Sequence, residues 1–414
     1  MANTINNVKD VGSIISKLAA GMLADKCQFI KSIDSEPLDS FGSTNGYSHG
    51  DTVNINKPAR FSVGTNADLT SALQNVTEEK VALALDQRAA IGISLTSAEV
   101  ATDLALKSWA KRILDPAMSS MAQNIESTVL TTAKNAVYNY VGDIDGTTVF
   151  DTALMLGARK KPVQNLAPMD DNMYALLNST AMASAVDQRK GLFQSSEDIK
   201  SQYKNGYMGY VDGMTYLENN LLPSHTNGND VTGAAIDDAA VATGASTIHI
   251  DGITTGTGTL KKGQVFTIAG VYAVHPITKV TRSDLQQFVV TADVTASGVS
   301  DADVSISPTI YGPTSGVLQN VSALPADDAA IVFFGAASSV IEQNLVYHKN
   351  AFRFVSVPLM KPSDSHMTAQ ETVDGMTVRV WQASDILTDK MILRLDVLYG
   401  FSAVRPEWAC RIGY

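Results

Sequence analysis

Residues 391–407 read MILRLDVLYGFSAVRPE, and in the first half of this stretch apolar side chains recur at every second position. The apolar residues at every second position are Met391, Leu393, Leu395 and Val397, and the polar residues Arg394 and Asp396 lie between them. Successive side chains of a strand point to opposite faces of a sheet. The spacing therefore predicts a strand with one apolar face, in a strongly β-structured region that also includes residues 377–381.

Upstream of this region, short apolar runs separated by Gly, Asp and Pro predict further strands. They cover residues 247–250, 264–268, 273–280, 288–290 and 304–306, followed by 330–334 and 352–359. The first five runs follow one another at turn-length spacing, which is typical of a small closed barrel or sandwich. Residues 224–246 before them are rich in Gly, Asn, Asp and Ala without a period, as linkers are. We therefore predict an inserted β domain over residues 224–315.

The N-terminal part of the sequence predicts a helix, an arm and a long loop. The helical spacing is carried by Val8, Val11, Ile15, Leu18 and Met22. Residues 31–50 are polar and have no period, so we expect an arm that has little to bury by itself. Candidate strands at 52–56 and 79–85 flank residues 59–78, a segment far longer than a hairpin tip needs. Such a segment predicts a projecting loop with a function of its own.

The middle of the sequence combines helical and strand patterns. Residues 96–140 form the longest helical stretch, with a capping box at Thr96 and Glu99, a kink or division at Pro116, and a stop at Gly142. A helix capped by Asp151 to about residue 161, a buried strand at 173–177 and a helix at 180–187 follow. Together with the terminal strands they predict an α+β core.

Composition limits the functional classes. The chain has 414 residues, 45% hydrophobic and 18% charged, which suffices for two or three domains with a real core. Its 31 basic and 42 acidic residues give a net charge of -11, which disfavours strong non-specific nucleic-acid binding. The densest basic cluster, residues 159–161, is a small patch. The sequence shows neither the pattern of a signal peptide nor an apolar run long enough to cross a bilayer.

Searches for catalytic, cofactor and metal motifs are negative. Residues 256–263 resemble a phosphate-binding loop, but Gln264 stands where that motif requires lysine. Asp301 and Asp303 resemble the start of a calcium loop that lacks its glycine and its bidentate glutamate. The six histidines show no metal-binding spacing, Ser402 lacks the second glycine of a nucleophile elbow, and the two cysteines, Cys27 and Cys410, belong to no Cys-x-x-Cys pair. We assign no catalytic residue, cofactor or metal ligand, and we expect no enzyme.

Three stretches carry a family resemblance. They are RLDVLYGFSAVRPE at 394–407, LKKGQVFTIAGV at 260–271 and FRFVSVPL at 352–359. The sequence resembles the major capsid (coat) proteins of tailed double-stranded-DNA phages, and more specifically those of short-tailed phages with an inserted β-barrel domain. The resemblance implies an α+β major-capsid fold with an N-arm, an extended β-loop, a long spine helix, peripheral and axial domains, and the barrel.

The resemblance also implies a domain plan. Its parts are the N-terminal helix and arm (1–50), the extended β-loop (51–95), the spine helix and peripheral domain (96–144), the first part of the axial domain (145–223), the inserted barrel (224–315), the second part of the axial domain (316–365) and the closing strands of the peripheral domain (366–414). The loop at 59–78 is then expected to reach a neighbouring subunit. The predicted inter-subunit contacts within it are Arg60, Phe61, Val63, Leu69 and Leu73.

The implied function is a self-assembling icosahedral shell subunit of the virion. Its expected partners are copies of itself in hexamers and pentamers, a scaffolding protein and a portal, with no membrane. The shell would form as a precursor in the host bacterial cytoplasm, expand on packaging, and enclose double-stranded DNA without sequence-specific binding. Two alternatives remain open: an encapsulin-like cellular compartment, which the inserted β domain disfavours, and a β-rich secreted binding protein or adhesin, which the helical middle disfavours.

Overall fold

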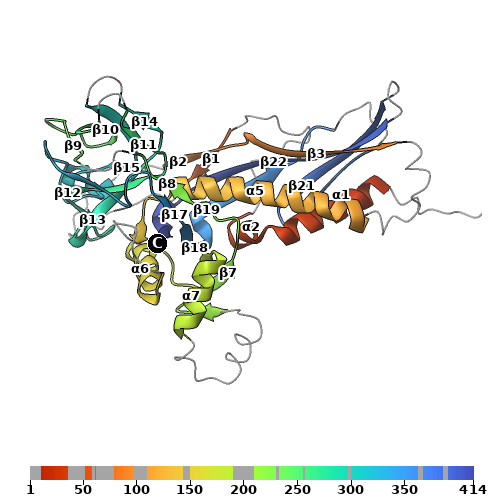
Figure 1. The fold of residues 1–414 in the computed structure, drawn as a ribbon, viewed down its shortest axis with the longest axis horizontal. Coiled ribbons are helices and arrows are strands. Elements are labelled where there is room, and N and C mark those ends of the chain that lie inside the picture. Colours follow the sequence, from red (N-terminus) through yellow and green to blue (C-terminus); the bar gives the residue numbers. More distant parts are fainter. Residues whose placement is uncertain are drawn as a thin grey trace, which may run out of the picture. The chain divides into compact units, whose positions relative to one another are not determined.

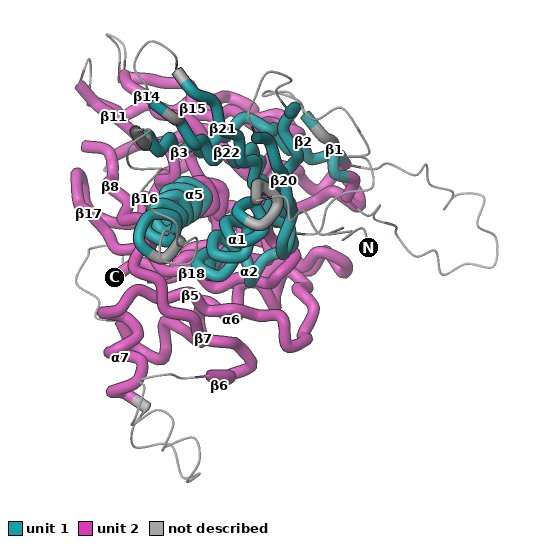
Figure 2. Tube along the Cα trace, turned by 90° about the vertical axis from the view of Figure 1, so that its right-hand side faces the viewer, with its two compact units in different colours: residues 1–55, 80–129, 353–402 teal, residues 56–79, 130–352, 403–414 magenta. Residues whose placement is uncertain are grey.

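A computed structural model describes residues 11–35, 52–57, 61, 79–96, 110–142, 150–189, 209–229, 233–254, 257–296, 300–361, 367–385 and 390–414. The chain divides into two compact units (Figure 2). Unit 1 comprises residues 1–55, 80–129 and 353–402, and unit 2 comprises residues 56–79, 130–352 and 403–414. The predicted arm beyond residue 35, most of the loop at 59–78 and residues 97–109 of the predicted helical stretch lie outside the described residues.

Unit 1 is built on a sheet in which the first part of the stretch at 391–407 lies in the long strand β22. Its strands are β3 (Gln87–Thr96), β19 (Phe352–Val357), β20 (Met367–Val373), β21 (Met376–Asp385) and β22 (Lys390–Ala403). β22 pairs antiparallel with β21 and with the whole length of β3, and Figure 1 shows these three long strands side by side. Leu393, Leu395 and Val397 of β22 are buried, so the predicted apolar face is confirmed. A separate two-stranded sheet pairs β1 (Thr52–Asn56) with β2 (Lys80–Ala84).

The N-terminal helix of unit 1 follows the predicted spacing of apolar side chains only in part, since Ile15 is buried but Leu18 is exposed. They are α1 (Val11–Lys26), α2 (Gln28–Ser32), a π-helical turn η1 (Ala110–Leu114) and α5 (Asp115–Ala136), which continues into unit 2. Ile15, Ala19 and Leu23 are buried at four-residue intervals, and α1 lies against β20 and β21. Pro116 occupies the first turn of α5, where its missing N–H costs nothing.

The core of unit 2 is a six-stranded sheet flanked by helices. The strand order is β4 (Tyr140–Gly142), β23 (Ala409–Gly413), β18 (Gln343–His348), β5 (Met173–Leu177), β7 (Met214–Glu218) and β6 (Tyr210–Val211). β4 runs parallel to β23, and β5 runs parallel to β7. The helices are α6 (Thr152–Gln164) and α7 (Ser179–Arg189), with short 3-10 turns η3 (Lys349–Ala351) and η4 (Pro406–Trp408). As predicted, Asp151 caps α6: its side chain accepts a hydrogen bond from the Leu154 backbone N–H at 2.8 Å.

Unit 2 also contains a nearly closed barrel. Its strands, in order, are β16 (Ile331–Phe333), β12 (Val265–Val274), β13 (Thr281–Val290), β15 (Ala302–Ile310), β10 (Ala245–Asp251) and β9 (Ala235–Ile236). The two edges meet because Ala235 forms an antiparallel bridge with Ala330 and the Ile331 N–H donates to the Ala234 carbonyl at 2.9 Å. Two short pairs, β8 (His225–Thr226) with β17 (Val340–Ile341) and β11 (Thr259–Leu260) with β14 (Val294–Thr295), and the 3-10 turn η2 (Pro313–Leu318) accompany it.

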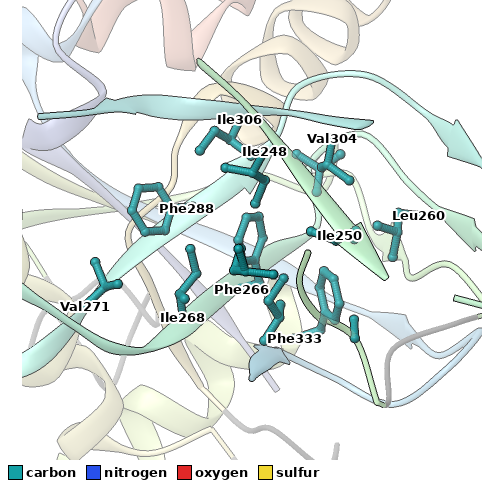
Figure 3. Packing of buried hydrophobic residues seen from close by; sticks show 14 of the residues in the cluster. Ile248, Ile250, Leu260, Phe266, Ile268, Val271, Phe288, Val304, Ile306 and Phe333 are labelled. Atoms are coloured by element: carbon teal, nitrogen blue, oxygen red, sulfur yellow. The ribbon is translucent and has the colours of Figure 1, made fainter. Parts of the chain in front are cut away.

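The barrel has an apolar interior of its own, shown in Figure 3. The Phe266 ring lies 5.8 Å from that of Phe288 and 5.5 Å from that of Phe333, measured between ring centroids. Ile248 of β10 and Ile306 of β15 pack into the same cluster. Burying aromatic and branched side chains in this way is the main stabilisation of a small β domain.

Two element predictions were wrong. β3 ends at Thr96, the predicted capping residue, and residues 97–109 lie outside the described residues, so the cap at Thr96 stays a prediction. Gly142 does not end a helix, because α5 ends at Ala136 and Tyr140–Gly142 pairs with β23. Of the predicted strand 273–280, the first two residues end β12 and residues 275–280 form the turn to β13, where the His275 N–H donates to the Val280 carbonyl at 2.9 Å.

The strand pairs of the structure cross the predicted bounds of the inserted domain and of the closing strands. Residues 224–246 contain β8 and β9 and contribute Ile236 and Val241 to the barrel core, so they are not a plain linker. β16, expected in the axial domain, pairs with β12 of the barrel. β23, expected with the closing strands, lies in unit 2 because it pairs with β18 and β4.

Candidate functional site

The base of the predicted contact loop is closed by the two residues that flank it. The Lys57 N–H donates to the Glu79 carbonyl at 2.7 Å, and the two side chains are 3.9 Å apart, Nζ to Oε2. Among the predicted contact residues, Phe61 is described, and its side chain is 60% exposed. Arg60, Val63, Leu69 and Leu73 lie outside the described residues. A single exposed aromatic side chain is common on protein surfaces, so the contact role of all five stays a prediction.

A buried carboxylate in the unit 1 sheet gathers three arginines. The Asp396 side chain is fully buried and lies 2.8 Å from Arg394 Nε and 3.1 Å from Arg88 Nη2, and it also forms an ion pair with Arg379. Burial acts to raise the pKa of Asp396, but hydrogen bonds from Arg379 and Arg394 and the charges of Arg379 and Arg88 outweigh it and lower the pKa. The cluster therefore ties β3, β21 and β22 together through one ionised carboxylate.

Sequence reasoning missed this cluster. It placed Arg394 and Asp396 on the polar face of their strand without predicting that the carboxylate is buried. The spacing of two positions did indicate that Arg394 and Asp396 share a face, but nothing in the sequence identifies Arg88 or Arg379 as their partners.

The barrel is joined to the core of unit 2 by a junction made largely of polar contacts. The Tyr140 N–H donates to Gln287 Oε1 at 2.9 Å, and Gln287 Nε2 donates to the Tyr140 carbonyl at 2.8 Å. The amide side chain of a barrel strand thus completes the backbone hydrogen bonding of a core strand. A small apolar cluster of Tyr138, Tyr140, Val265 and Val289 accompanies it.

Charged side chains form the second part of the junction. Lys160 and Lys161 of α6 lie 3.1 Å and 3.6 Å from Asp284 of the barrel strand β13. Burial acts to raise the pKa of Asp284, and the hydrogen bond from Lys160 together with the charges of both lysines lowers it overall. Beside them, Arg282 donates to the Gln164 carbonyl and to Asn165 Oδ1. The densest basic cluster of the sequence thus anchors the barrel through two of its three residues.

The structure shows which neighbours the candidate chemical groups of the sequence have. Within them, no group of three or more His, Cys, Asp or Glu side chains could hold a metal ion. Asp301 and Asp303, the candidate calcium residues, instead lie 3.4 Å and 2.8 Å from the nitrogens of His249. Cys27 and Cys410 are buried free thiols, and burial raises the pKa of Cys410 to about 12, which leaves it protonated and unreactive. Across the described ranges, no helix is both long and apolar enough to cross a membrane.

Comparison with known proteins decides the family. The family model described as P22 coat protein (gene protein 5) matches residues 41–412. The chain belongs to the P22 coat protein family. It is accordingly a capsid protein, a structural subunit of a phage shell that associates with copies of itself in the virion.

Several solved structures of phage capsids are similar to this chain. The capsid of Ralstonia phage GP4 is similar over 88% of this chain and 84% of that chain, with 7% identity and a TM-score of 0.47. The capsid of Helicobacter pylori bacteriophage KHP30 is similar over 91% and 86%, with 12% identity and a TM-score of 0.44. The CUS-3 coat protein I-domain matches 25% of this chain and 97% of that chain, with 29% identity and a TM-score of 0.20. No curated protein sequence matches the chain.

Proposed function

We propose that this coat protein assembles into an icosahedral shell through a precursor that expands as double-stranded DNA is packaged. In this proposal a scaffolding protein and a portal take part, assembly occurs in the cytoplasm of the host bacterium, and the shell encloses DNA without reading its sequence. The observation that carries the proposal is the match of the P22 coat protein model over almost the entire chain. The net charge of -11 supports an enclosing role, because a binding role would require clustered basic side chains.

We also propose that the loop at 59–78 contacts a neighbouring subunit through Arg60, Phe61, Val63, Leu69 and Leu73. The closed base at Lys57 and Glu79 supports this role, because it fixes where the loop leaves β1 and β2. A loop anchored in this way can be shortened without altering the strands that carry it. The predicted domain plan, with the inserted barrel between two parts of the axial domain, is likewise proposed.

Deletion of residues 64–76 tests the loop. The shortened chain should stay soluble and folded, because the segment starts and ends inside the loop, but it should fail to form closed shells. Electron microscopy of negatively stained particles and sedimentation velocity, each with and without a co-expressed scaffolding protein, measure the outcome. A matched control replaces the same residues with a Gly/Ser segment of equal length. Normal shells from the deletion would refute the contact role while leaving the coat-protein family unaffected.

A further inference from the structure

Three cationic or potentially cationic side chains lie buried at the place where the chain enters the barrel. Arg411 comes from β23, Lys134 from α5 and His225 from β8, and each side chain belongs to a residue that is almost fully buried. The charge of Arg411 acts to lower the pKa of Lys134, and the charges of Arg411 and Lys134 act to lower the pKa of His225. Three elements that are distant in the sequence thus contribute buried basic side chains to the interior of unit 2.

Arg411 has no counter-charge among the described residues. Its guanidinium Nε and Nη2 are buried without a hydrogen-bond partner, and none of the described carboxylates forms an ion pair with it. The ring of Tyr140, 6.0 Å from the guanidinium carbon, gives a weak cation–π contact at best. A buried guanidinium without a paired charge is strongly unfavourable. Burial accordingly lowers the pKa of Arg411 to about 10.

The contact between Lys134 and His225 leaves the second ring nitrogen of His225 without a hydrogen-bond partner. Lys134 Nζ donates to the Ser224 carbonyl at 3.1 Å and lies 3.4 Å from His225 Nδ1. Burial, and then the charges of Arg411 and Lys134, lower the pKa of His225 to about 3, so its ring is neutral. With Nδ1 accepting from the ammonium group, the ring proton is on Nε2, and this buried atom also lacks a partner.

We propose that Arg411, Lys134 and His225 form a buried binding site for a small monovalent anion of the halide class. The guanidinium and the imidazole Nε2 supply N–H donors, and Lys134 supplies a second positive charge. Burial of all three residues excludes a side chain of another protein as the occupant, because a chain segment could not enter without unfolding the junction. A bound halide would neutralise one of the two formal charges and link β23, α5 and β8.

Water is the competing occupant. Buried waters commonly satisfy polar groups, and the amide oxygens of Asn135 and Gln343 in the same unit also lack partners. Water could complete all these hydrogen bonds, but it would leave two desolvated cations without a counter-charge. If a halide occupies the site, the stability of the chain should rise with halide concentration, and if water occupies it, the stability should not depend on which anion is present.

Thermal unfolding of the full chain in sodium chloride and in sodium gluconate, at matched ionic strength, tests the site. The parent chain should gain roughly 2–4 °C in Tm for each tenfold rise in chloride beyond the dissociation constant, and gluconate should give no such gain. Arg411→Met removes the charge with similar volume, so it should lose the chloride response and be at least as stable as the parent in gluconate. Arg282→Met is the matched control: it removes a partly buried arginine of the same unit and should keep the chloride response.

Chlorine-35 NMR on the same samples gives a second reading if Arg411→Met does not fold. The chloride signal should broaden with the parent chain and with Arg282→Met, and the broadening should fall with Lys134→Met. Equal Tm responses of the parent and Arg411→Met, or equal line widths for the parent and Lys134→Met, would show that only water occupies the site and would overturn the proposal. Shell assembly is not part of either measurement, so failure here leaves the proposed function standing.

Discussion

Replacing Asp396 with asparagine is the sharpest test of how the unit 1 sheet is held together. The substitution keeps the shape of the side chain and removes its charge, leaving three arginines around a neutral amide. Arg379 is the partner that matters most, since its side chain is 9% exposed, whereas those of Arg88 and Arg394 are 38% and 39% exposed. Each of the two exposed pairs contributes less than about 1 kcal/mol because water screens it.

The buried pair sets the expected magnitude. Removing one partner of a buried ion pair leaves an uncompensated charge and costs about 3–5 kcal/mol. We expect Asp396→Asn to lower the free energy of unfolding by about that amount. Urea unfolding of the full chain measures the loss, and hydrogen exchange of peptides from β21 and β22 locates it.

The same carboxylate predicts a pH dependence. Its pKa is lowered in the folded chain, so its contribution is fully present above the unfolded value of about 3.9 and is lost as pH falls through the folded pKa. Asp396→Asn should abolish this part of the acid sensitivity. Asp374→Asn is the matched control, because Asp374 is an exposed residue in the β20–β21 turn, in a left-handed conformation that asparagine accepts. If the free energies of unfolding of Asp396→Asn and Asp374→Asn differed by less than about 0.5 kcal/mol, the reasoning would be refuted.

Three further outcomes are expected. Phe266→Ala should destabilise the barrel by about 3–5 kcal/mol, because it opens a cavity in the aromatic cluster. Val332→Ala, at a half-exposed position of β16, should change the stability little, and urea unfolding compares the two variants. Asp151→Ala should cost about 1 kcal/mol through loss of the α6 cap, measured as faster amide exchange in the first turn of that helix. The hydrogen bond to Asp303 raises the pKa of His249, so its stabilising contribution is present below about pH 6.5 and lost as pH rises through the folded value; His249→Gln should flatten the Tm profile across that range.

Local patterns predicted much of the fold where neighbouring residues determine the structure. The strand at 173–177, the cap at Asp151 and the proline at the start of α5 agree with the structure, because each depends on side chains a few positions apart. The resemblance that indicated a coat protein came from contiguous stretches for the same reason, and the family match confirms it.

Features made by distant pairing could not be predicted in this way. Ile91, Ile93 and Leu95 of β3 alternate with small or polar residues, but the partner that supplies the hydrogen bonds of this strand, β22, lies far along the sequence. β9 lies in a segment that resembles a linker, and β16 was predicted as a strand but not as part of the barrel, yet together they close it. The buried charge at Asp396 depends on partners from other strands, which no spacing rule identifies.

The contrast between the interior of the barrel and its junction explains how an inserted domain can be held without becoming part of the core. The interior is a separate apolar cluster around Phe266. Burial of these side chains therefore stabilises the barrel independently of the six-stranded sheet. The junction consists of amide–backbone hydrogen bonds through Gln287 and partly exposed ion pairs through Asp284. Contacts of this kind contribute little net stability but demand exact geometry, because buried donors and acceptors are costly when unpaired. The junction therefore specifies the orientation of the barrel more than it stabilises it, which suits a subunit whose surfaces must meet those of identical neighbours.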